Sequence, residues 1–392
     1  MKKQDIVCIS MTTWEGDFMK TIVHMMSQLA KNHRVMFVDY PFTWKDFAQG
    51  ITGKEPKPWK RMIGIESRLR TLESKGNEVY HLTLPPVVPT NWINDPDIFQ
   101  KIIRSQAAVV GNAICKAMKK LNFESPIVIN AFNPIIGVPL IGKLNESKLV
   151  YYCYDDIGAA NWCGKHGGTM EDRYIKKVDE VIVTSEALLR QKSKQNTNTT
   201  LVKNGVDFEL FNRAFHQDKK ERPVIGYVGS LDFRLDYDLI ENLVKERPEY
   251  DFHFIGRVTQ SGAQSEQLKK HPNVRFFGAQ QPNDIPKFMK KFDLGIIPFA
   301  MNDFTKSIYP LKINEYLAAG IPVVSTDFAP LDDFFGNVVI AKNAEQFING
   351  VDDEFKSDTY DKKLGRTAVA KQNDWSKRAA QVEEILNQPV HA

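Results

Sequence analysis

Lys312 and Glu315 are the residues whose types and spacing best suit a chemical role. Pro310 fits the first turn of a helix and Gly320 fits its end, so a helix over about 310–319 is predicted. Both side chains then share a face near the positive end of the helix dipole, where free N–H groups and a lysine suit a pyrophosphate. The carboxylate, one turn deeper, can accept hydrogen bonds from two ribose hydroxyls. The alternative is an exposed ion pair three residues apart.

Two further loops carry cations directly after predicted strands. Gly229 permits a close approach of backbone to a ligand, and Arg234 lies a few residues beyond it. Arg257 follows the next strand along the chain. Guanidinium groups bind phosphate oxygens in a bidentate manner, so Arg234 is predicted to contact a phosphate and Arg257 a phosphate or a sugar. A surface pair of Arg234 with Asp236 or Asp238 is the alternative.

Asp155 and Asp156 end a predicted strand in the first half of the chain. Like charges on adjacent residues oppose ionisation, and strand geometry points the two side chains to different sides. One of them can therefore act as a base on a hydroxyl or hold a sugar hydroxyl. Helix capping or turn formation ahead of Gly158 is the alternative.

The loop after the first predicted strand carries Trp14, Glu15, Gly16 and Asp17. Gly16 allows a ligand to approach the backbone, and the indole of Trp14 can stack on a sugar or a lipid group. Asp17 can instead cap the helix that starts there.

Several function classes lack support in the sequence. His, Cys, Asp and Glu show no metal-ligand spacing, and neither a G-x-S-x-G motif nor a P-loop is present, which leaves hydrolases and nucleoside triphosphatases without a signature. The four cysteines are scattered, as expected of free thiols in a reducing cytoplasm. A net charge of +4 suits a nucleotide phosphate or an anionic membrane and is too small to indicate nucleic acid.

The elements that position these residues follow from a repeated rhythm of short β-branched runs and amphipathic stretches, which predicts parallel sheets covered by helices on both faces. The predicted strands are Ile6–Ser10, Arg34–Asp39, Pro126–Asn130, Leu149–Cys153, Glu180–Thr184, Pro223–Gly229, Asp251–Ile255, Val274–Phe277, Leu294–Pro298, Pro322–Thr326 and Val338–Ile340. Helices are predicted over Asp17–Lys31 and Gln106–Leu121. Ligands of such sheets bind beyond the carboxyl ends of the strands, where all the residues above lie.

A length of 392 residues favours two domains. Polar, charge-rich segments between 195 and 222 place the boundary: a Rossmann-like domain over 1–205, a second over 206–375, and a terminal helix over 376–392 near their junction. That helix begins at Asp374 and shows an apolar face. The first residues have the pattern of a strand rather than of a signal peptide.

The sequence resembles the GT-B glycosyltransferases, and among them the retaining family 4 type that includes bacterial polysaccharide and teichuronic-acid enzymes. The motifs that carry the resemblance occur in order over nearly the whole chain: Trp14–Asp17, Tyr151–Asp156, Val178–Ser185 with Lys203–Asp207, and Phe292–Pro298 leading into Pro310–Val324. The resemblance implies an α/β fold of two doubly wound domains facing a deep cleft.

The resemblance also implies site residues. Glu315 matches the family's ribose-binding glutamate, whereas Ser307 stands where a second glutamate is common and Ser230 where an arginine is common. The implied donor-binding residues are Gly229, Arg234, Arg257, Ser307, Ile308, Tyr309, Lys312 and Glu315, and the implied acceptor-binding residues are Trp14, Glu15, Gly16, Asp17 and Asn133. No metal or other cofactor is expected, since cations and a helix dipole can stabilise the diphosphate leaving group.

The activity implied is transfer of a sugar from a nucleotide sugar, a UDP-sugar by preference, to a hydroxyl of a glycan or lipid-linked acceptor in the cytoplasm. Retention follows the family, although the Asp155 and Asp156 pair also resembles the base region of inverting enzymes. A sugar-nucleotide 2-epimerase and an inactive binding module of the same fold are the alternatives. Aromatic and basic residues of the first half permit peripheral contact with the inner membrane face, or form a solvated loop with partly buried aromatics: Trp44, Lys54, Lys57, Trp59, Lys60, Arg61 and Trp92.

Overall fold

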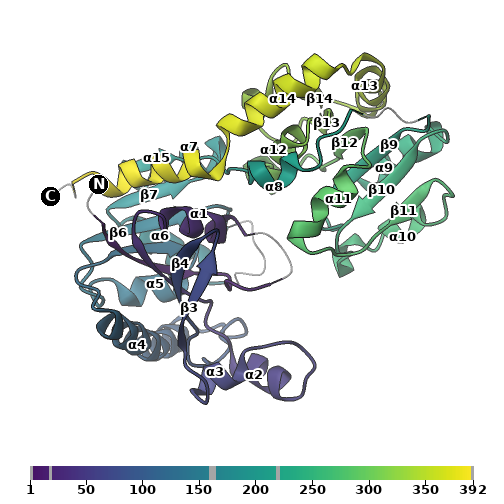
Figure 1. Cartoon of the computed structure of the whole chain (residues 1–392). Coiled ribbons are helices and arrows are strands. Elements are labelled where there is room, and N and C mark those ends of the chain that lie inside the picture. Colours follow the sequence, from purple (N-terminus) through teal and green to yellow (C-terminus); the bar gives the residue numbers. More distant parts are fainter. Residues whose placement is uncertain (1–2, 17–19, 159–164, 218–220, 390–392) are drawn as a thin grey trace. The chain divides into compact units, whose positions relative to one another are not determined.

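A computed structural model describes residues 3–16, 20–158, 165–217 and 221–389 of the chain (Figure 1). The chain divides into two compact units. Unit 1 holds the chain up to Gly16, Lys20–Lys203 and the segment from Ala379 onward, and unit 2 holds Asn204–Arg378.

Unit 1 is built on an eight-stranded sheet in the order β3-β4-β2-β1-β5-β6-β7-β8. All neighbouring pairs are parallel except β3 with β4. The strands are β1 (Asp5–Ser10), β2 (Arg34–Val38), β3 (Leu69–Ser74), β4 (Asn77–Leu82), β5 (Ile127–Ala131), β6 (Lys148–Cys153), β7 (Glu180–Val183) and β8 (Thr199–Leu201). The central strands β5, β6 and β7 are buried throughout, as expected of a parallel sheet covered on both faces.

The β3–β4 hairpin and the short edge strand β8 are the parts of this sheet that the predicted strands do not include. The turn residues of the hairpin, Lys75 and Gly76, both have positive φ, 50° and 75°, which is the conformation of a two-residue hairpin turn. The alternating pattern on both sides of this turn was the available signal.

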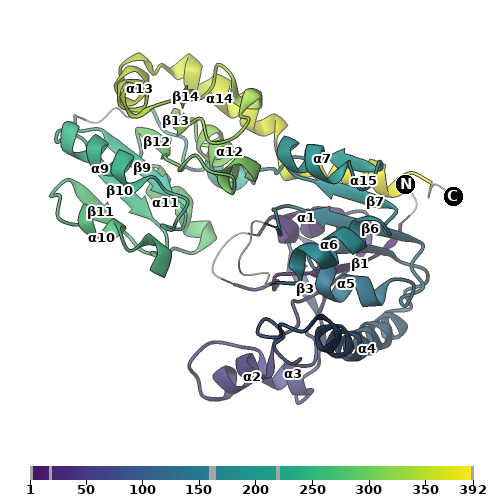
Figure 2. The ribbon, with the colours of Figure 1, turned by 180° about the vertical axis from the view of Figure 1, so that it is seen from behind.

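The helices of unit 1 are α1 (Thr21–Leu29), α2 (Trp44–Ile51), α3 (Trp59–Ile63), α4 (Pro96–Leu121), α5 (Pro134–Leu140), α6 (Gly167–Ile175) and α7 (Glu186–Lys192). Asp95 caps α4 by accepting from two backbone N–H groups, and Asn122 ends it in the left-handed conformation. The helix therefore begins ten residues before the predicted Gln106. Figure 2 shows α5 and α6 side by side, and α4 packs on α5.

Unit 2 is built on a six-stranded parallel sheet in the order β11-β10-β9-β12-β13-β14. The strands are β9 (Val224–Val228), β10 (Asp251–Ile255), β11 (Val274–Phe276), β12 (Leu294–Ile297), β13 (Val323–Thr326) and β14 (Val339–Ala341). The helices are α8 (Phe208–Asn212), α9 (Tyr237–Glu246), α10 (Ser265–Leu268), α11 (Ile285–Met289), α12 (Leu311–Ala318), α13 (Ala344–Ser357) and α14 (Tyr360–Gln372). Each of the six predicted strands of the second half is present within one residue at either end.

Tyr316 fixes α12 on this sheet. Its ring lies against Gly295 of β12, where a Cβ atom would come within 2.8 Å of the ring. Its hydroxyl accepts a hydrogen bond of 2.8 Å from the backbone N–H of Val228, at the carboxyl end of β9. The packing and the bond together hold α12 against β12 and the carboxyl end of β9.

The helix α15 (Trp375–Asn387) begins in unit 2 and continues into unit 1. Trp375 is buried against Gly205, and its N–H donates to the carbonyl of Val206. Beyond Ala379, the predicted apolar face is buried, and the Lys148 ammonium of β6 donates to the carbonyl of Ile385 at 2.7 Å. Among the described residues, no helix has the length and hydropathy needed to span a membrane.

Replacement of Tyr316 by Phe keeps the ring and removes the acceptor of a buried N–H. We expect Tyr316→Phe to lower the unfolding temperature of unit 2 by about 2–8 °C, since an unsatisfied buried donor costs roughly 1–2 kcal/mol. Differential scanning calorimetry measures the shift, with Tyr360→Phe, at a half-exposed tyrosine, as the matched control. Equal midpoints for both variants would contradict the role given to the hydroxyl.

Candidate functional site

The loops after β9 and β10 lie backbone to backbone at the carboxyl edge of the sheet of unit 2. Gly229 and Gly256 follow these strands with φ of 155° and 153°. A Cβ atom on Gly256 would lie 1.8 Å from the carbonyl oxygen of Gly229, so only glycine fits there. The Leu231 N–H donates to the Arg257 carbonyl at 2.9 Å, which joins the two loops that carry the predicted cations.

Arg234 is held by an acid that sequence analysis did not consider. Its Nε and a terminal nitrogen donate to the two oxygens of Asp232 at 2.8 and 2.7 Å. Asp236 instead caps α9 by accepting from the Leu239 N–H. This bidentate contact orients the Arg234 side chain. It uses two of the five N–H donors of the guanidinium. Arg257 is exposed directly after Gly256.

Lys312 and Glu315 form an ion pair on α12, with the lysine ammonium 2.7 Å from Oε2 of the carboxylate. The Glu315 side chain is 5% exposed and that of Lys312 is 28% exposed, so the pair differs from the fully exposed alternative. Pro310 is the residue before the helix rather than part of its first turn, and no side chain caps this helix end. The amino end of α12 thus has no capping side chain, and Lys312 lies in its first turn. A helix amino end with a lysine suits an anion.

The segment before α12 uses much of its own hydrogen-bonding capacity. The Ser307 hydroxyl donates to the Phe304 carbonyl at 2.8 Å, and the N–H groups of Ser307 and Ile308 donate within the same 3₁₀ turn. Tyr309 is buried, and burial raises the pKa of its hydroxyl to about 12. These three predicted donor-binding residues thus lie directly before α12, with the Ser307 and Tyr309 side chains buried and that of Ile308 half-buried.

In unit 1, polar contacts among Asp39, His81 and Arg70 hold the loop after β1 in place. The Trp14 N–H donates to Asp39 at 2.8 Å, and the other oxygen of Asp39 lies 2.8 Å from Nε2 of His81. Arg70 donates to Nδ1 of His81 at 3.0 Å, which leaves Nε2 as the ring nitrogen that faces Asp39.

Glu15 is bound by two arginines, with contacts of 3.0 Å to Arg61 and 2.6 Å to Arg70. Burial raises the pKa of Glu15, and the hydrogen bonds from Arg70 and Arg61 lower it below its ordinary value. The carboxylate therefore holds the loop in place. Gly16 has φ of 148°, and the predicted residue Asp17 lies outside the described residues.

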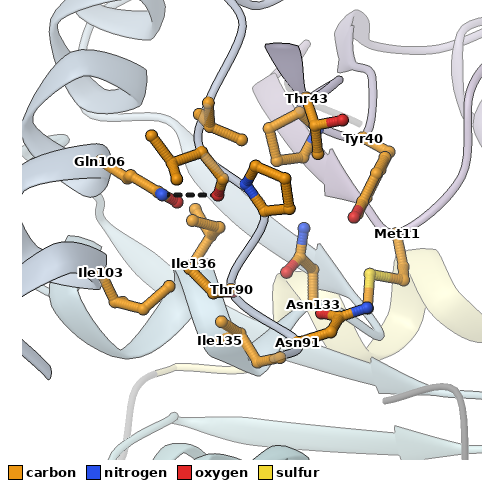
Figure 3. A pocket seen from close by; sticks show the side chains of 14 residues that line it. Met11, Tyr40, Thr43, Thr90, Asn91, Ile103, Gln106, Asn133, Ile135 and Ile136 are labelled. Atoms are coloured by element: carbon orange, nitrogen blue, oxygen red, sulfur yellow. Dashed lines mark hydrogen bonds between the residues drawn. The ribbon is translucent and has the colours of Figure 1, made fainter. Parts of the chain in front are cut away.

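Asn133 lines a cavity of ≈ 240 Å³ at the carboxyl edge of the sheet of unit 1 (Figure 3). The cavity approaches the lower end of ligand-pocket volumes, about 300 Å³. Figure 3 shows Tyr40 and Thr43 on one side of the cavity, Gln106 on the other, and Asn133 between them. The Asn133 amide donates to the Ser10 carbonyl at 3.3 Å, which ties α5 to the end of β1.

Sequence analysis missed most of the residues that line this cavity. Tyr40 and Thr43 follow β2, which was predicted, so a search of the loop after each predicted strand would have included them. Asn91 follows β4, which was not predicted. Gln106 comes from α4 and donates to the Val88 carbonyl at 2.7 Å, a contact that no local pattern reveals. Of the predicted acceptor-binding residues that the structure describes, Asn133 is the one at the cavity wall.

Asp155 and Asp156 form a turn after β6. Asp155 accepts from the Asp156 N–H at 3.0 Å, and Asp156 accepts from the Gly158 N–H at 2.9 Å. Turn formation was the alternative to a catalytic role. The second carboxylate oxygen of Asp156 takes no part in the hydrogen bond from Gly158. Both residues are half-buried.

A buried charged cluster supports the end of β6 below this turn. The Glu171 carboxylate accepts from the Tyr151 hydroxyl at 2.8 Å and from the Lys192 ammonium at 2.7 Å. All three side chains are buried. The neighbouring Cys153 thiol donates to the Asp155 carbonyl at 3.3 Å, which connects the cluster to the turn. Within the described ranges, no group of three or more His, Cys, Asp and Glu side chains could hold a metal ion.

Two doubly wound units of this kind define the GT-B fold, as predicted. Solved structures confirm it: the sucrose-phosphate synthase of Thermosynechococcus elongatus matches with a TM-score of 0.72 and 16% identity over 98% of this chain and 99% of the other. Anabaena HepE in complex with UDP and glucose matches with a TM-score of 0.63 and 14% identity over 99% and 100%. The catalytic domain of Arabidopsis thaliana starch synthase IV, bound to ADP and acarbose, gives 0.66 and 13% over 99% and 100%.

Residues 222–354 match the family model of the glycosyl transferases group 1, which confirms the predicted resemblance for the sheet of unit 2. A protein of Bacillus subtilis strain 168, assigned to teichuronic acid biosynthesis as the glycosyltransferase TuaH, is 30% identical over 213 residues. The alignment covers 49% of this chain and 53% of that relative, so the chain matches about half the length of the relative.

The buried cluster gives a prediction for unit 1. Lys192→Met leaves the Glu171 carboxylate without its counter-charge, which we expect to destabilise unit 1 by about 3–5 kcal/mol in urea unfolding. The double variant Lys192→Met with Glu171→Leu removes both charges and should recover most of this loss. Lys177→Met, at an exposed lysine, is the matched control. If the double variant is as unstable as the single one, the charge balance is not what stabilises this site.

Proposed function

We propose that the chain is a glycosyltransferase that moves a sugar from a UDP-sugar to a hydroxyl of a glycan or lipid-linked acceptor. The observation that carries the proposal is the Lys312 and Glu315 pair on α12, whose amino end is uncapped. Tyr316 ties this helix to the end of β9, the strand whose following loop carries Arg234. Unit 2 binds the donor and unit 1 the acceptor. The complex of HepE with UDP and glucose supports a UDP-sugar as donor.

Three donor-site residues and the amino end of α12 have separate roles in this proposal. Lys312, Arg234 and the N–H groups of α12 bind the diphosphate, and Glu315 accepts from the ribose hydroxyls. As the bond between the anomeric carbon and the diphosphate oxygen breaks, these groups stabilise the negative charge that develops on the leaving group. Because they supply this stabilisation themselves, we propose that the reaction needs no metal ion.

The acceptor side has a base and a binding cavity. Asp155 or Asp156 orients the acceptor hydroxyl or takes its proton as the oxygen bonds to the anomeric carbon. The cavity at Asn133 offers amide and hydroxyl groups to the acceptor beside an apolar wall. Retention of the anomeric configuration is proposed on the resemblance to family 4.

The donor site is tested by binding of UDP. We expect Glu315→Ala and Lys312→Ala each to weaken UDP binding about 10–100-fold, because each removes charge-assisted hydrogen bonds. Isothermal titration calorimetry measures the affinity. Lys306→Ala is the matched control, since Lys306 forms an i,i+3 pair with Asp303 in which the two side chains are 63% and 100% exposed. UDP affinity unchanged in Glu315→Ala, or tighter binding of ADP or GDP by the unaltered protein, contradicts this assignment.

The reaction itself is tested by product analysis. With excess EDTA, transfer from the UDP-sugar should continue at the rate seen without it, and NMR of the product should show the anomeric configuration of the donor. Loss of activity that added Mg²⁺ or Mn²⁺ restores would show a metal-dependent step. An inverted product would contradict retention and indicate a single displacement in which Asp155 or Asp156 acts as the base.

A further inference from the structure

The helix α2 exposes the apolar face that an amphipathic helix normally buries. Trp44, Ala48 and Ile51 stand at i, i+4 and i+7 and therefore share one face, and none of the three is buried. The exposed fraction is 51% for Trp44 and 53% for Ile51, and the other residues of α2 are not buried either.

This face is held in place by its surroundings. Thr43 and Asp46 form a capping box at the start of α2, and the Trp44 N–H donates to the Val87 carbonyl at 3.0 Å. The Phe47 ring packs edge-on against Trp59, and the following helix α3 is anchored by the buried Met62. The exposed face is thus a fixed part of unit 1.

Three exposed apolar residues line the cavity described above or directly follow a residue that lines it. Thr43 and Asn91 line the cavity, and the residue that follows each is an exposed tryptophan, Trp44 and Trp92. Trp92 is 70% exposed. Val88 lines the cavity and is exposed as well. We call Trp44, Ala48, Ile51, Val88 and Trp92 the apolar rim.

Positive charge accompanies the apolar rim. Residues 43–66 hold five Lys and Arg side chains and three acidic ones, a formal charge of +2. Lys60 pairs with Glu66, and Arg61 pairs with Glu15. Asp46 and Glu55 both lie within ion-pair distance of Lys57, at 3.7 and 2.9 Å. Lys45 within α2 and Lys54 just after it are exposed, so their charge faces solvent.

We propose that the apolar rim, with Lys45 and Lys54, docks on the surface of a bilayer that contains anionic lipid. Tryptophan side chains favour the membrane interface, and an amphipathic helix with lysines beside its apolar face binds anionic lipid. Lysine is depleted in the cores of protein interfaces, which disfavours a protein partner here. The docking surface rests on the proposed function, because its role is to bring the acceptor cavity of unit 1 to an acceptor held in the membrane.

Co-sedimentation of the full chain with vesicles tests the proposal. The unaltered protein should bind vesicles of phosphatidylcholine with phosphatidylglycerol and bind vesicles of phosphatidylcholine alone much more weakly. Removing two lysine charges in Lys45→Gln with Lys54→Gln should weaken binding to the anionic vesicles about 25-fold, at roughly fivefold a lysine. Trp44→Ser with Trp92→Ser should weaken it at least tenfold, about the effect of burying two indole rings.

Matched controls come from α4, which carries exposed residues of the same types. Val109→Ser and the pair Lys116→Gln with Lys120→Gln should bind both kinds of vesicle as the unaltered protein does. The proposal is overturned if the unaltered protein ignores anionic vesicles or if the variants of the rim and of α4 lose equal binding. It is also overturned if the Trp44 and Trp92 variant converts a dimer to a monomer in sedimentation analysis, because the rim would then bind a second copy.

Calorimetry with UDP separates this proposal from the proposed function. The variants of the rim should keep the UDP affinity of the unaltered protein, since their residues lie in unit 1. If the unaltered protein binds vesicles but not UDP, the proposed function fails and the docking surface stands. If it binds UDP but not vesicles, the docking surface alone fails.

Discussion

The hydrogen bond from the Val228 N–H to the Tyr316 hydroxyl is the contact on which the donor site depends. A helix lying on a parallel sheet can shift along its axis or rotate unless something specific fixes it. The Tyr316 ring, seated on Gly295, and its hydroxyl, bound at the end of β9, remove both freedoms. Lys312 and Glu315 thereby lie on a helix that is fixed to the carboxyl end of β9, the strand whose following loop carries Arg234. A buried carboxylate such as Glu315 is stable there because a lysine lies within 2.7 Å.

The strands of both units could be predicted closely because each is a short apolar run bounded by polar residues, and such runs in alternation with helices have few other solutions. The amino end of α4 and the β3–β4 hairpin were missed for a different reason. Their signals were local turn and capping residues, Asp95 with Pro96 and Lys75 with Gly76, rather than hydrophobic periodicity. The outermost strand β3 is also only partly buried, which weakens its apolar pattern.

The candidate site was predictable in its residue types and less so in their partners. Glu315 and Lys312 are a helical turn apart, so their pairing follows from spacing, but the burial of the carboxylate depends on the tertiary fold. Asp236 and Asp238 were the predicted partners of Arg234, whereas its partner is Asp232, which is equally near in sequence, because Asp236 caps α9. Glu15 was predicted to face a ligand, and the structure binds it to Arg61 and Arg70, which lie about fifty residues away in the chain. Such long-range ion pairs leave no mark in a single sequence.

The path of α15 has a consequence for the order in which the polypeptide can fold. Unit 1 needs a segment that the ribosome makes only after all of unit 2, because Ala379 and the residues beyond it complete its core. Until that segment emerges, the Lys148 ammonium lacks the Ile385 carbonyl that it binds in the finished structure. Unit 2 forms an uninterrupted stretch and can fold while synthesis continues, so the nascent chain reaches its final form from the middle outward.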